Sequence, residues 1–252
     1  MNPLRHDFIR ACQAAQPPLP GTPAQTSGLR YLDIGCGGGI FAESAARLHT
    51  TERVVGVDPS REVLTIARSH ARQDPLFCET KPGLARRLEY INGTIESLPR
   101  PVSLDEQYDV VSLFEVLEHV ASPRDVIAHA APFVRPGGWL VGSTIARTWT
   151  SWLTTKVIAE DVLRIVPRGT HDWHKYIESE ELRGMIEGKG GVDGMGLASE
   201  KGSAKMQSPG HWRWGPMQCM GVIYVPGVGW REVPGSEKLG NYFFAARKEL
   251  RG

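Results

Sequence analysis

Short apolar segments alternate with amphipathic segments along the first 145 residues of the chain. The apolar runs predict strands of the kind that is buried in a parallel sheet. Between them, apolar positions recur with helical spacing over 40–49, over 60–72 and from Pro123 onward. This alternation predicts a parallel sheet joined by right-handed crossovers. The five expected strands are Leu29–Ile34, 54–57, Leu88–Asn92, 109–114 and 139–143.

Capping and turn residues predict where the helices begin and end. Ser60 is suited to cap the helix over 60–72. Pro123 is suited to the first turn of the helix that starts there, and Pro136-Gly137-Gly138 to end that helix. A short helix is also expected over 4–13, before a loop over 15–28 whose prolines exclude a helix.

The pattern changes after residue 145. A long helical stretch covers 150–166, and strands at Gln218–Val225 and 242–247 are expected to close an antiparallel edge. We therefore expect an α/β fold with a mostly parallel seven-stranded sheet, helices on both faces and an antiparallel edge strand. The chain is expected to form a single domain over 1–252, with an N-terminal arm and loop over 1–28, a helical lid or membrane-contact insertion over 145–187 and an irregular insertion over 188–217.

A glycine-rich turn and an acidic residue predict a nucleoside-binding edge. The turn from Asp33 to Gly39 closes the first strand, and glycine there lets a ligand approach the backbone closely. A dinucleotide fingerprint would need glycine at the sixth position from Gly35, where the chain has Ile40. Asp58 ends the second strand, where a carboxylate can accept both hydroxyls of a ribose. The alternative is a tight turn followed by an N-capping aspartate, with no ligand.

These motifs together resemble the class I S-adenosylmethionine-dependent methyltransferases over about residues 29–145. The resemblance implies a Rossmann-like fold in which the glycine turn holds the methionine part of S-adenosylmethionine. It implies that Asp58 holds the ribose and that Gly93-Thr94-Ile95-Glu96 flanks the adenine.

Further segments resemble the ubiquinone biosynthesis O-methyltransferases, which methylate catechol hydroxyls of polyprenylated benzoate and quinol intermediates. By this resemblance Arg5 meets the cofactor carboxylate, Gly35 its amino-acid part and Asp58 the ribose, and Phe114 contributes its backbone. The residues alone leave another interpretation of Arg5 open, a solvated charge on a frayed terminus. The matching segments are Asn2-Pro3-Leu4-Arg5, Glu-Val-Leu-Glu-His-Val over 115–120, Ile-Val-Pro-Arg-Gly-Thr-His-Asp over 165–172, and Asn241-Tyr242.

The resemblance also implies a compartment and partners. Trp173 and the insertions are closer to the eukaryotic members, which lie peripherally on the matrix side of the mitochondrial inner membrane with other ubiquinone-biosynthesis proteins. A targeting sequence would then be absent from this chain, as is the segment that precedes Asn2 in the family. Residues 74–87 and 188–217 also depart from the family pattern.

Glu115, Glu118 and His119 follow the fourth strand and predict a divalent-metal site. If a helical turn starts there, the three side chains share one face. Two carboxylates and an imidazole would then converge, and a hard cation such as Mg²⁺, which accepts carboxylates, would lower the pKa of a catechol hydroxyl and orient it. The resemblance supports the metal, since the ubiquinone family is magnesium-dependent. Two alternatives remain: His119 as a general base without metal, or a structural role for the cluster.

The stretch 150–166 and the tryptophans beside it predict contact with a membrane surface. Trp149 and Trp152 precede aliphatic residues interspersed with charged ones, a pattern typical of an interfacial helix that would reach a polyprenylated catechol. The alternative is a lid helix packed on the sheet. His171 is expected to shape the active-site wall rather than to bind a metal with His174.

Composition narrows the function classes. Twenty-nine basic and 28 acidic residues leave a formal net charge of +1, which argues against nucleic acid as a partner. The four cysteines form no C-x-x-C pair, so a disulfide framework is not expected. The chain contains no run of 18 uncharged apolar residues, so we expect no transmembrane span. The first 16 residues lack the apolar region of a secretory signal. Three alternative functions remain open: another small-molecule class I methyltransferase that uses His119 as a general base without metal, a nucleotide-dependent oxidoreductase, and an inactive scaffold.

Overall fold

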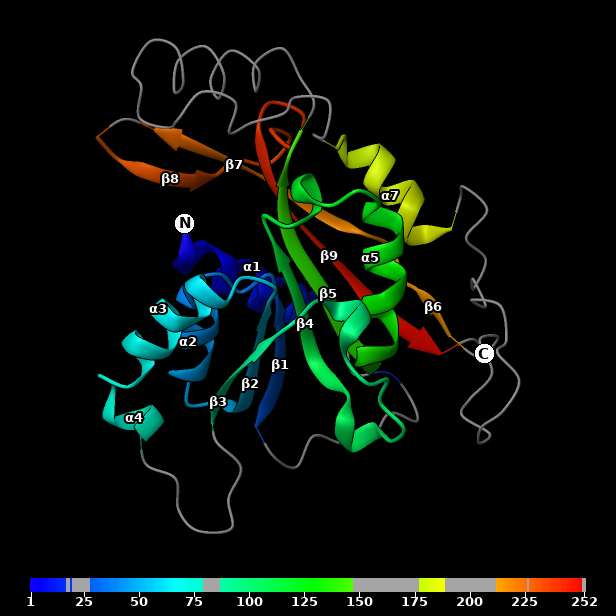
Figure 1. Cartoon of the computed structure of the whole chain (residues 1–252). Coiled ribbons are helices and arrows are strands. Elements are labelled where there is room, and N and C mark those ends of the chain that lie inside the picture. Colours follow the sequence, from blue (N-terminus) through cyan, green and yellow to red (C-terminus); the bar gives the residue numbers. More distant parts are fainter. Residues whose placement is uncertain are drawn as a thin grey trace.

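The computed structural model describes residues 1–16, 19, 28–78, 87–146, 177–188, 212–225 and 227–250 (Figure 1). One mixed sheet organises them, and its strands follow the order β3-β2-β1-β4-β5-β9-β7-β8, with β6 also paired to β9. The parallel strands are β1 (Leu29–Ile34), β2 (Thr51–Asp58), β3 (Leu88–Asn92), β4 (Tyr108–Phe114) and β5 (Val134–Ile145). Antiparallel pairing adds β6 (Trp212–Trp214), β7 (Gln218–Val225), β8 (Gly229–Glu232) and β9 (Asn241–Leu250).

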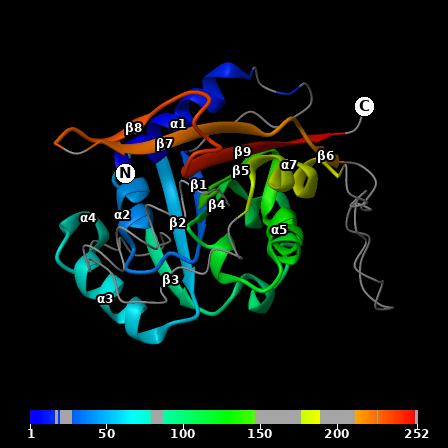
Figure 2. The ribbon, with the colours of Figure 1, turned by 90° about the horizontal axis from the view of Figure 1, so that it is seen from above.

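Helices cover both faces of this sheet, as the alternation predicts. Two apolar clusters form, one on each face: the first includes residues of α5 and α7, and the second includes residues of α1 and α2. Figure 2 shows α2 and α3 on one side of the parallel strands and α5 on the other. The helices are α1 (Asn2–Ala15), α2 (Ile40–Ala46), α3 (Arg61–Ala71), α4 (Pro75–Cys78), α5 (Pro123–Ala130) and α7 (Ser179–Glu187), with 3-10 turns η1 (Ile95–Ser97), η2 (Leu104–Glu106), η3 (Leu117–His119) and η4 (Ala131–Phe133).

The predicted cap at Ser60 and the predicted place of Pro123 are confirmed. The Ser60 hydroxyl accepts a hydrogen bond from the Val63 N–H at the start of α3. Ser122 caps α5 in the same way, with Pro123 in the first turn, where its missing N–H costs nothing.

Two details of the predicted sheet are wrong. Besides the seven expected strands, the sheet contains β6 and β8, so its antiparallel part is a region rather than one edge strand. These strands are three and four residues long, too short for a periodic signal. Pro136-Gly137-Gly138 does not end α5, which stops at Ala130. It lies inside β5, where Gly137 has φ 80° beside an irregularity in the β4–β5 register.

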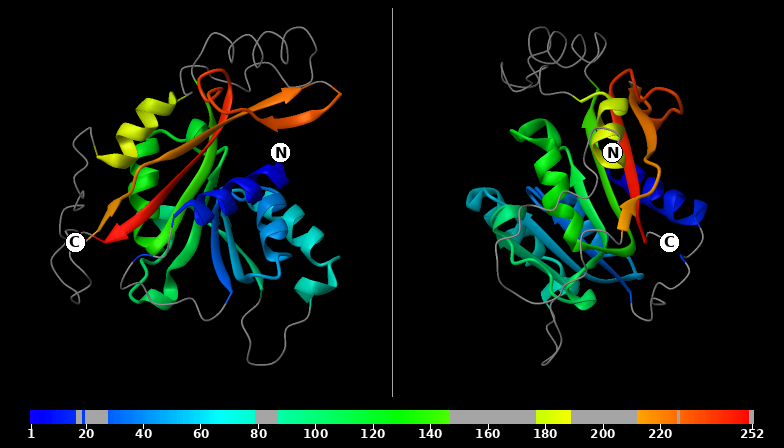
Figure 3. Two further views of the ribbon diagram at one scale, coloured as in Figure 1. Left: turned by 180° about the vertical axis from the view of Figure 1, so that it is seen from behind. Right: turned by 90° about the vertical axis from the view of Figure 1, so that its right-hand side faces the viewer.

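The N-terminal helix α1 packs against the sheet. Phe8, Ile9 and Cys12 are almost fully buried, and the ring centroids of Phe8 and Phe243 lie 5.5 Å apart. The β7–β8 hairpin lies beside α1 (Figure 3), and Trp230 of β8 packs against the same apolar cluster. The arm expected over 1–28 therefore begins as a docked helix.

Several predicted features lie outside the described residues. They are the helix over 150–166, Trp149, Trp152, Trp173, the 165–172 segment with His171, His174, and most of the insertions over 74–87 and 188–217.

Candidate active site

The glycine turn leaves the carboxyl end of β1 beside the point where the strand order reverses, the usual ligand crevice of open α/β sheets. Its glycines serve two purposes. A Cβ on Gly35 would lie 2.5 Å from Val116 Cγ2, and one on Gly39 would overlap the Tyr90 hydroxyl. Gly37 and Gly38 face open space. Two glycines are thus required by protein packing, and the middle pair exposes backbone to a ligand.

Asp58 is fixed beside this turn, where the sequence predicts it. Its Oδ2 accepts a hydrogen bond from the Gly37 N–H, and its Oδ1 accepts one from the Ser60 N–H, both at 2.9 Å. Asn92 Nδ2 donates to the Asp58 carbonyl oxygen at 3.1 Å. The carboxylate joins the glycine turn to the start of α3, and each oxygen keeps a lone pair for a ligand hydroxyl.

Arg5 reaches the same edge from α1. Its Nη2 donates to Glu115 Oε1 at 3.1 Å, and its guanidinium carbon lies 4.6 Å from the centre of the Phe114 ring. The side chain is only 15% exposed, which contradicts the interpretation of a solvated charge. Its Nε is buried without a hydrogen-bond partner. Such a donor is suited to one oxygen of an incoming carboxylate.

Asp33 lies beneath the turn as a buried carboxyl group. Ser112 Oγ donates to its Oδ1 at 2.7 Å. Burial raises the pKa of Asp33 to about 7, and the Ser112 hydrogen bond and the nearby Arg5 oppose that rise. The sequence motif includes Asp33, but only the β1–β4 register shows that Ser112 is its partner.

The three predicted metal ligands do not share a helical face. Glu115 has φ 59°, and its N–H donates to the Ser143 carbonyl oxygen, so no α-helix begins there. Only a short 3-10 turn, η3, follows. The expectation of a common face fails because an α-helical turn needs negative φ at Glu115.

Each of these side chains has its own surroundings. Glu115 pairs with Arg5, whereas Glu118 is 7% exposed and its Oε2 accepts a hydrogen bond from Thr144 Oγ1 at 3.0 Å. Burial raises the pKa of Glu118 to about 7. His119 is exposed. Across the described ranges, no three His, Cys, Asp or Glu side chains are grouped closely enough to hold a metal ion. The two carboxylates suit a hard cation, but the present arrangement of the three side chains does not.

Sequence reasoning missed three contacts of the site. Val116 packs against Gly35, Thr144 holds Glu118, and Tyr90 supports Gly39. Each joins strands or turns that are distant in the chain, so only the sheet register could have indicated them.

Comparison with known proteins agrees with this geometry. A family model described as a methyltransferase domain matches residues 4–190. Among curated relatives, the mitochondrial ubiquinone biosynthesis O-methyltransferase of Schizosaccharomyces pombe is 39% identical over 229 residues, 89% of this chain and 70% of the relative. That of Candida albicans is 36% identical over 222 residues, 88% of this chain and 59% of the relative. The Roseobacter denitrificans enzyme is 37% identical over 215 residues, 85% of this chain and 78% of the relative.

Solved structures support the fold. The plantazolicin methyltransferase BpumL, in complex with SAH, has a TM-score of 0.58 at 13% identity, covering 98% of this chain and 83% of that one. The magnesium protoporphyrin IX methyltransferase of Synechocystis, with bound SAH, has a TM-score of 0.54 at 15% identity, covering 98% and 81%.

The sheet order, the glycine turn and the family match define the chain as a class I S-adenosylmethionine-dependent methyltransferase. The chain is 39% and 37% identical to two relatives and covers 70% and 78% of their lengths, which narrows the assignment to one family. The chain belongs to the ubiquinone biosynthesis O-methyltransferase family.

Proposed function

We propose that this protein transfers a methyl group from S-adenosylmethionine to a catechol hydroxyl of polyprenylated dihydroxybenzoate or demethylubiquinol intermediates in ubiquinone biosynthesis. The observation that carries the proposal is the placement of Asp58 and Arg5 on opposite sides of the glycine turn. Asp58 ends β2 and Phe114, beneath Arg5, ends β4, and β1 lies between these strands. Asp58 then suits the ribose, Gly35 and its neighbours the amino-acid part, and Arg5 the carboxylate.

The chain's own residues must position the acceptor and deal with its proton. When bound, S-adenosylmethionine supplies a methyl group on a positively charged sulfur. The catechol oxygen must lose its proton as it bonds to that carbon, and the product SAH keeps the electron pair of the broken C–S bond. Holding the two reactants in line lowers the barrier through orientation alone. The remaining task is to accept or displace the hydroxyl proton.

For that task we propose a divalent cation such as Mg²⁺, with Glu115, Glu118 and His119 as its ligands. Their chemistry and their place at the carboxyl edge of β4 support it. Binding requires Glu115 to leave Arg5 and Glu118 to leave Thr144. The second candidate is His119 as general base without metal. It is favoured by the exposure of His119 and by the absence, within the described residues, of a ready metal group.

Chelation separates the two candidates. The assay measures methylation of a short-tailed catechol in excess EDTA, then with Mg²⁺ restored. If the enzyme needs a metal, EDTA should abolish methylation and Mg²⁺ should restore it. Glu115→Ala, Glu118→Ala and His119→Ala should then each be severely impaired. A lone base predicts no effect of EDTA, an inactive His119→Ala and a nearly normal Glu115→Ala. His129→Ala, a half-buried histidine on α5, is the matched control.

The cofactor assignment has its own test. Calorimetry should show binding of SAH and no binding of NAD. The reverse result would favour the oxidoreductase class.

The last part of the proposal concerns where in the cell the protein works. We propose a peripheral position on the matrix side of the mitochondrial inner membrane, in contact with other ubiquinone-biosynthesis proteins. The names of the two yeast relatives support a mitochondrial location. None of the described helices is long and apolar enough to cross a membrane. Fractionation of the full-length protein in cells tests the location, and recovery in the cytosol would contradict it.

A further inference from the structure

A row of four residues crosses the sheet directly beneath the glycine turn. Tyr90 of β3 is in register with Gly56 of β2, Gly56 with Asp33 of β1, and Asp33 with Ser112 of β4. Neighbours in register on parallel strands point to the same face. Tyr31 and Val54, two positions earlier on β1 and β2, belong to the cluster that contains α2 residues, so this row faces α2.

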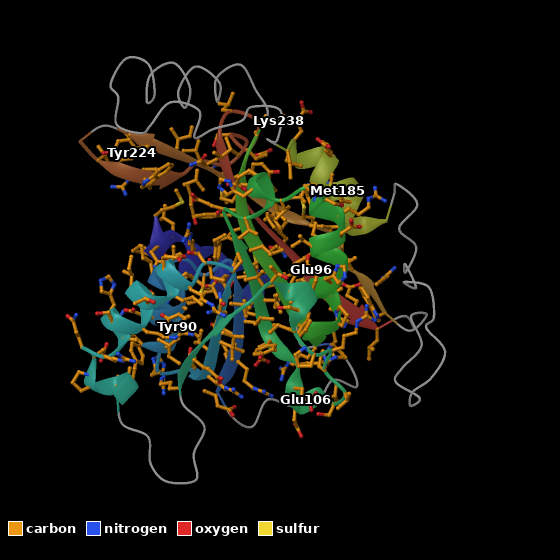
Figure 4. All side chains as sticks on the ribbon, in the orientation of Figure 1. Tyr90, Glu96, Glu106, Met185, Tyr224 and Lys238 are labelled. Atoms are coloured by element: carbon orange, nitrogen blue, oxygen red, sulfur yellow. The ribbon has the colours of Figure 1, made fainter. Side chains whose placement is uncertain are left out.

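Gly56 leaves a gap in this row, and the Tyr90 ring occupies it. A Cβ on Gly56 would lie 2.8 Å from Tyr90 Cδ1 and 2.9 Å from Cys36 Sγ. The ring therefore leans across β2 and carries its hydroxyl to Gly39, where a Cβ would overlap it. Figure 4 labels Tyr90 among the side chains of the described residues. A side chain of β3 thus touches the turn that follows β1, two strands away.

Other contacts fix Tyr90 in this position. Arg68 Nη2 of α3 donates to the Tyr90 carbonyl oxygen at 2.9 Å. The phenol oxygen is buried and has no hydrogen-bond partner among the described residues. Burial raises the pKa of Tyr90, with Glu43 and Cys36 adding to the rise, so the phenol is neutral. Its contact with the turn is steric rather than ionic.

We infer that Tyr90 is a positioning residue, which supports Cys36–Gly39 from the sheet side in the shape that binds the cofactor. The inference rests on the proposed function, in which this turn holds S-adenosylmethionine. It also assigns Gly56 and Gly39 a specific role: they make room for the Tyr90 ring and hydroxyl. The glycine that ends the G-x-G-x-G motif then serves a protein contact, and the cofactor meets Gly37 and Gly38.

Calorimetry with SAH tests the inference. Tyr90→Leu removes the support and should raise the Kd for SAH roughly tenfold, the lower end of the range for losing a residue that orients a binding group. Tyr90→Phe keeps the ring but removes the hydroxyl that reaches Gly39, so it should weaken SAH binding, though less than Tyr90→Leu does. Gly56→Ala pushes the ring and Cys36 from below and should also weaken binding. Gly56→Ala combined with Tyr90→Leu refills the gap and should bind SAH more tightly than Gly56→Ala alone.

Tyr108→Leu is the matched control, because Tyr108 is a half-buried tyrosine at the opposite end of the sheet, where β4 begins. It should lower the unfolding temperature and leave the Kd for SAH within about twofold. In turnover assays, Tyr90→Leu should raise KM for S-adenosylmethionine and leave kcat at saturation nearly unchanged. A merely structural role would not separate these constants.

Three outcomes overturn the inference: unchanged SAH affinity in folded Tyr90→Leu, unchanged affinity in Gly56→Ala, or strictly additive losses in the double variant. If Tyr90→Leu does not fold, Gly56→Ala and Tyr90→Phe decide, since both keep the aromatic ring. Failure of the wild type to bind SAH contradicts the proposed function itself and is seen before any variant is compared.

Discussion

Asp58 joins the two halves of the expected cofactor site through hydrogen bonds to Gly37 and Ser60. Replacing Asp58 by Ala should therefore weaken SAH binding by about 1.5–3 kcal/mol, the range for hydrogen bonds to a charged group. The fold should survive, since the side chain lies at the end of a strand rather than in an apolar cluster. Calorimetry measures the loss. Asp105→Ala, an exposed carboxylate in η2, is the control, and equal affinity in both variants would contradict the ribose assignment.

Single residues were predictable where a local motif defines them. Asp58 follows a strand and Gly37 lies in a glycine motif, so their proximity follows from parallel topology alone. Tyr90 and Thr144 were not predictable, because their contacts depend on register and on a gap at Gly56. Glu115 has a positive φ although it is not glycine, and its residue type does not predict that conformation.

At the scale of elements, α1 brings Arg5 into the site. Arg5→Ala should weaken SAH binding by about 1.5–3 kcal/mol if the guanidinium holds the cofactor carboxylate. Arg5→Lys should recover only part of the loss, because an ammonium cannot form a bidentate pair while stacked on Phe114. Arg10→Ala on the same helix is the matched control, since Arg10 is 66% exposed and pairs with Asp7. Equal affinity in Arg5→Ala and Arg10→Ala would leave Arg5 without its proposed role.

A buried lysine joins β9 to the segment between α5 and β5. Lys248 Nζ donates to the carbonyl oxygens of Ala131 and Val134 at 2.9 and 2.7 Å and lies 4.7 Å from the centre of the Trp212 ring. Burial lowers the pKa of Lys248 from 10.5 to about 8. The folded state therefore loses this proton at lower pH than the unfolded chain.

This pKa shift predicts a pH dependence of stability. Relative to Lys248→Met, the wild type should gain free energy of unfolding as pH rises from about 8 to 10.5, because the unfolded state binds more protons in that range. The gain should be on the order of 2 kcal/mol. Urea unfolding at several pH values measures it. Lys238→Met, at an exposed lysine, should show no such relative gain. If the difference in free energy of unfolding between wild type and Lys248→Met did not change with pH, the lowered pKa of Lys248 would be contradicted.

Elements were predictable to the extent that each carries its own periodic or capping signal. Leu88–Asn92 and Gln218–Val225 match β3 and β7, Ser60 caps α3, and Pro123 lies in the first turn of α5. The end of α5 was not predictable, because Pro136-Gly137-Gly138 is as compatible with an irregular strand as with a helix stop. The strand conformation prevails because β5 pairs with β4 on one side and β9 on the other.

At the scale of the molecule, the parallel strands and the antiparallel region have different tasks. The parallel half ends at the glycine turn, Asp58 and Glu115, so it carries the expected cofactor and acceptor groups. The antiparallel region supports α1 through β8 and β9 and therefore helps to hold Arg5 against Glu115 and Phe114. The lipid-tailed acceptor that we propose would approach the carboxyl edge, where β5 ends at Ile145. The segment with Trp149 and Trp152 follows in the chain, which is why we expect membrane contact there.

Replacing Trp149 and Trp152 together by Ser should reduce binding of the full chain to vesicles containing anionic lipid. Interfacial tryptophans favour the boundary between headgroups and acyl chains, and serine does not. Turnover of a short-tailed, water-soluble catechol without vesicles should be unchanged, because that acceptor needs no membrane. Vesicle flotation and a soluble methylation assay measure the two effects on the same preparation. Equal loss of both activities would indicate a lid packed over the active site, and no loss of vesicle binding would show that these tryptophans do not contact the membrane. Vesicles of zwitterionic lipid alone provide the control, since they should retain any tryptophan effect while removing the contribution of lipid charge.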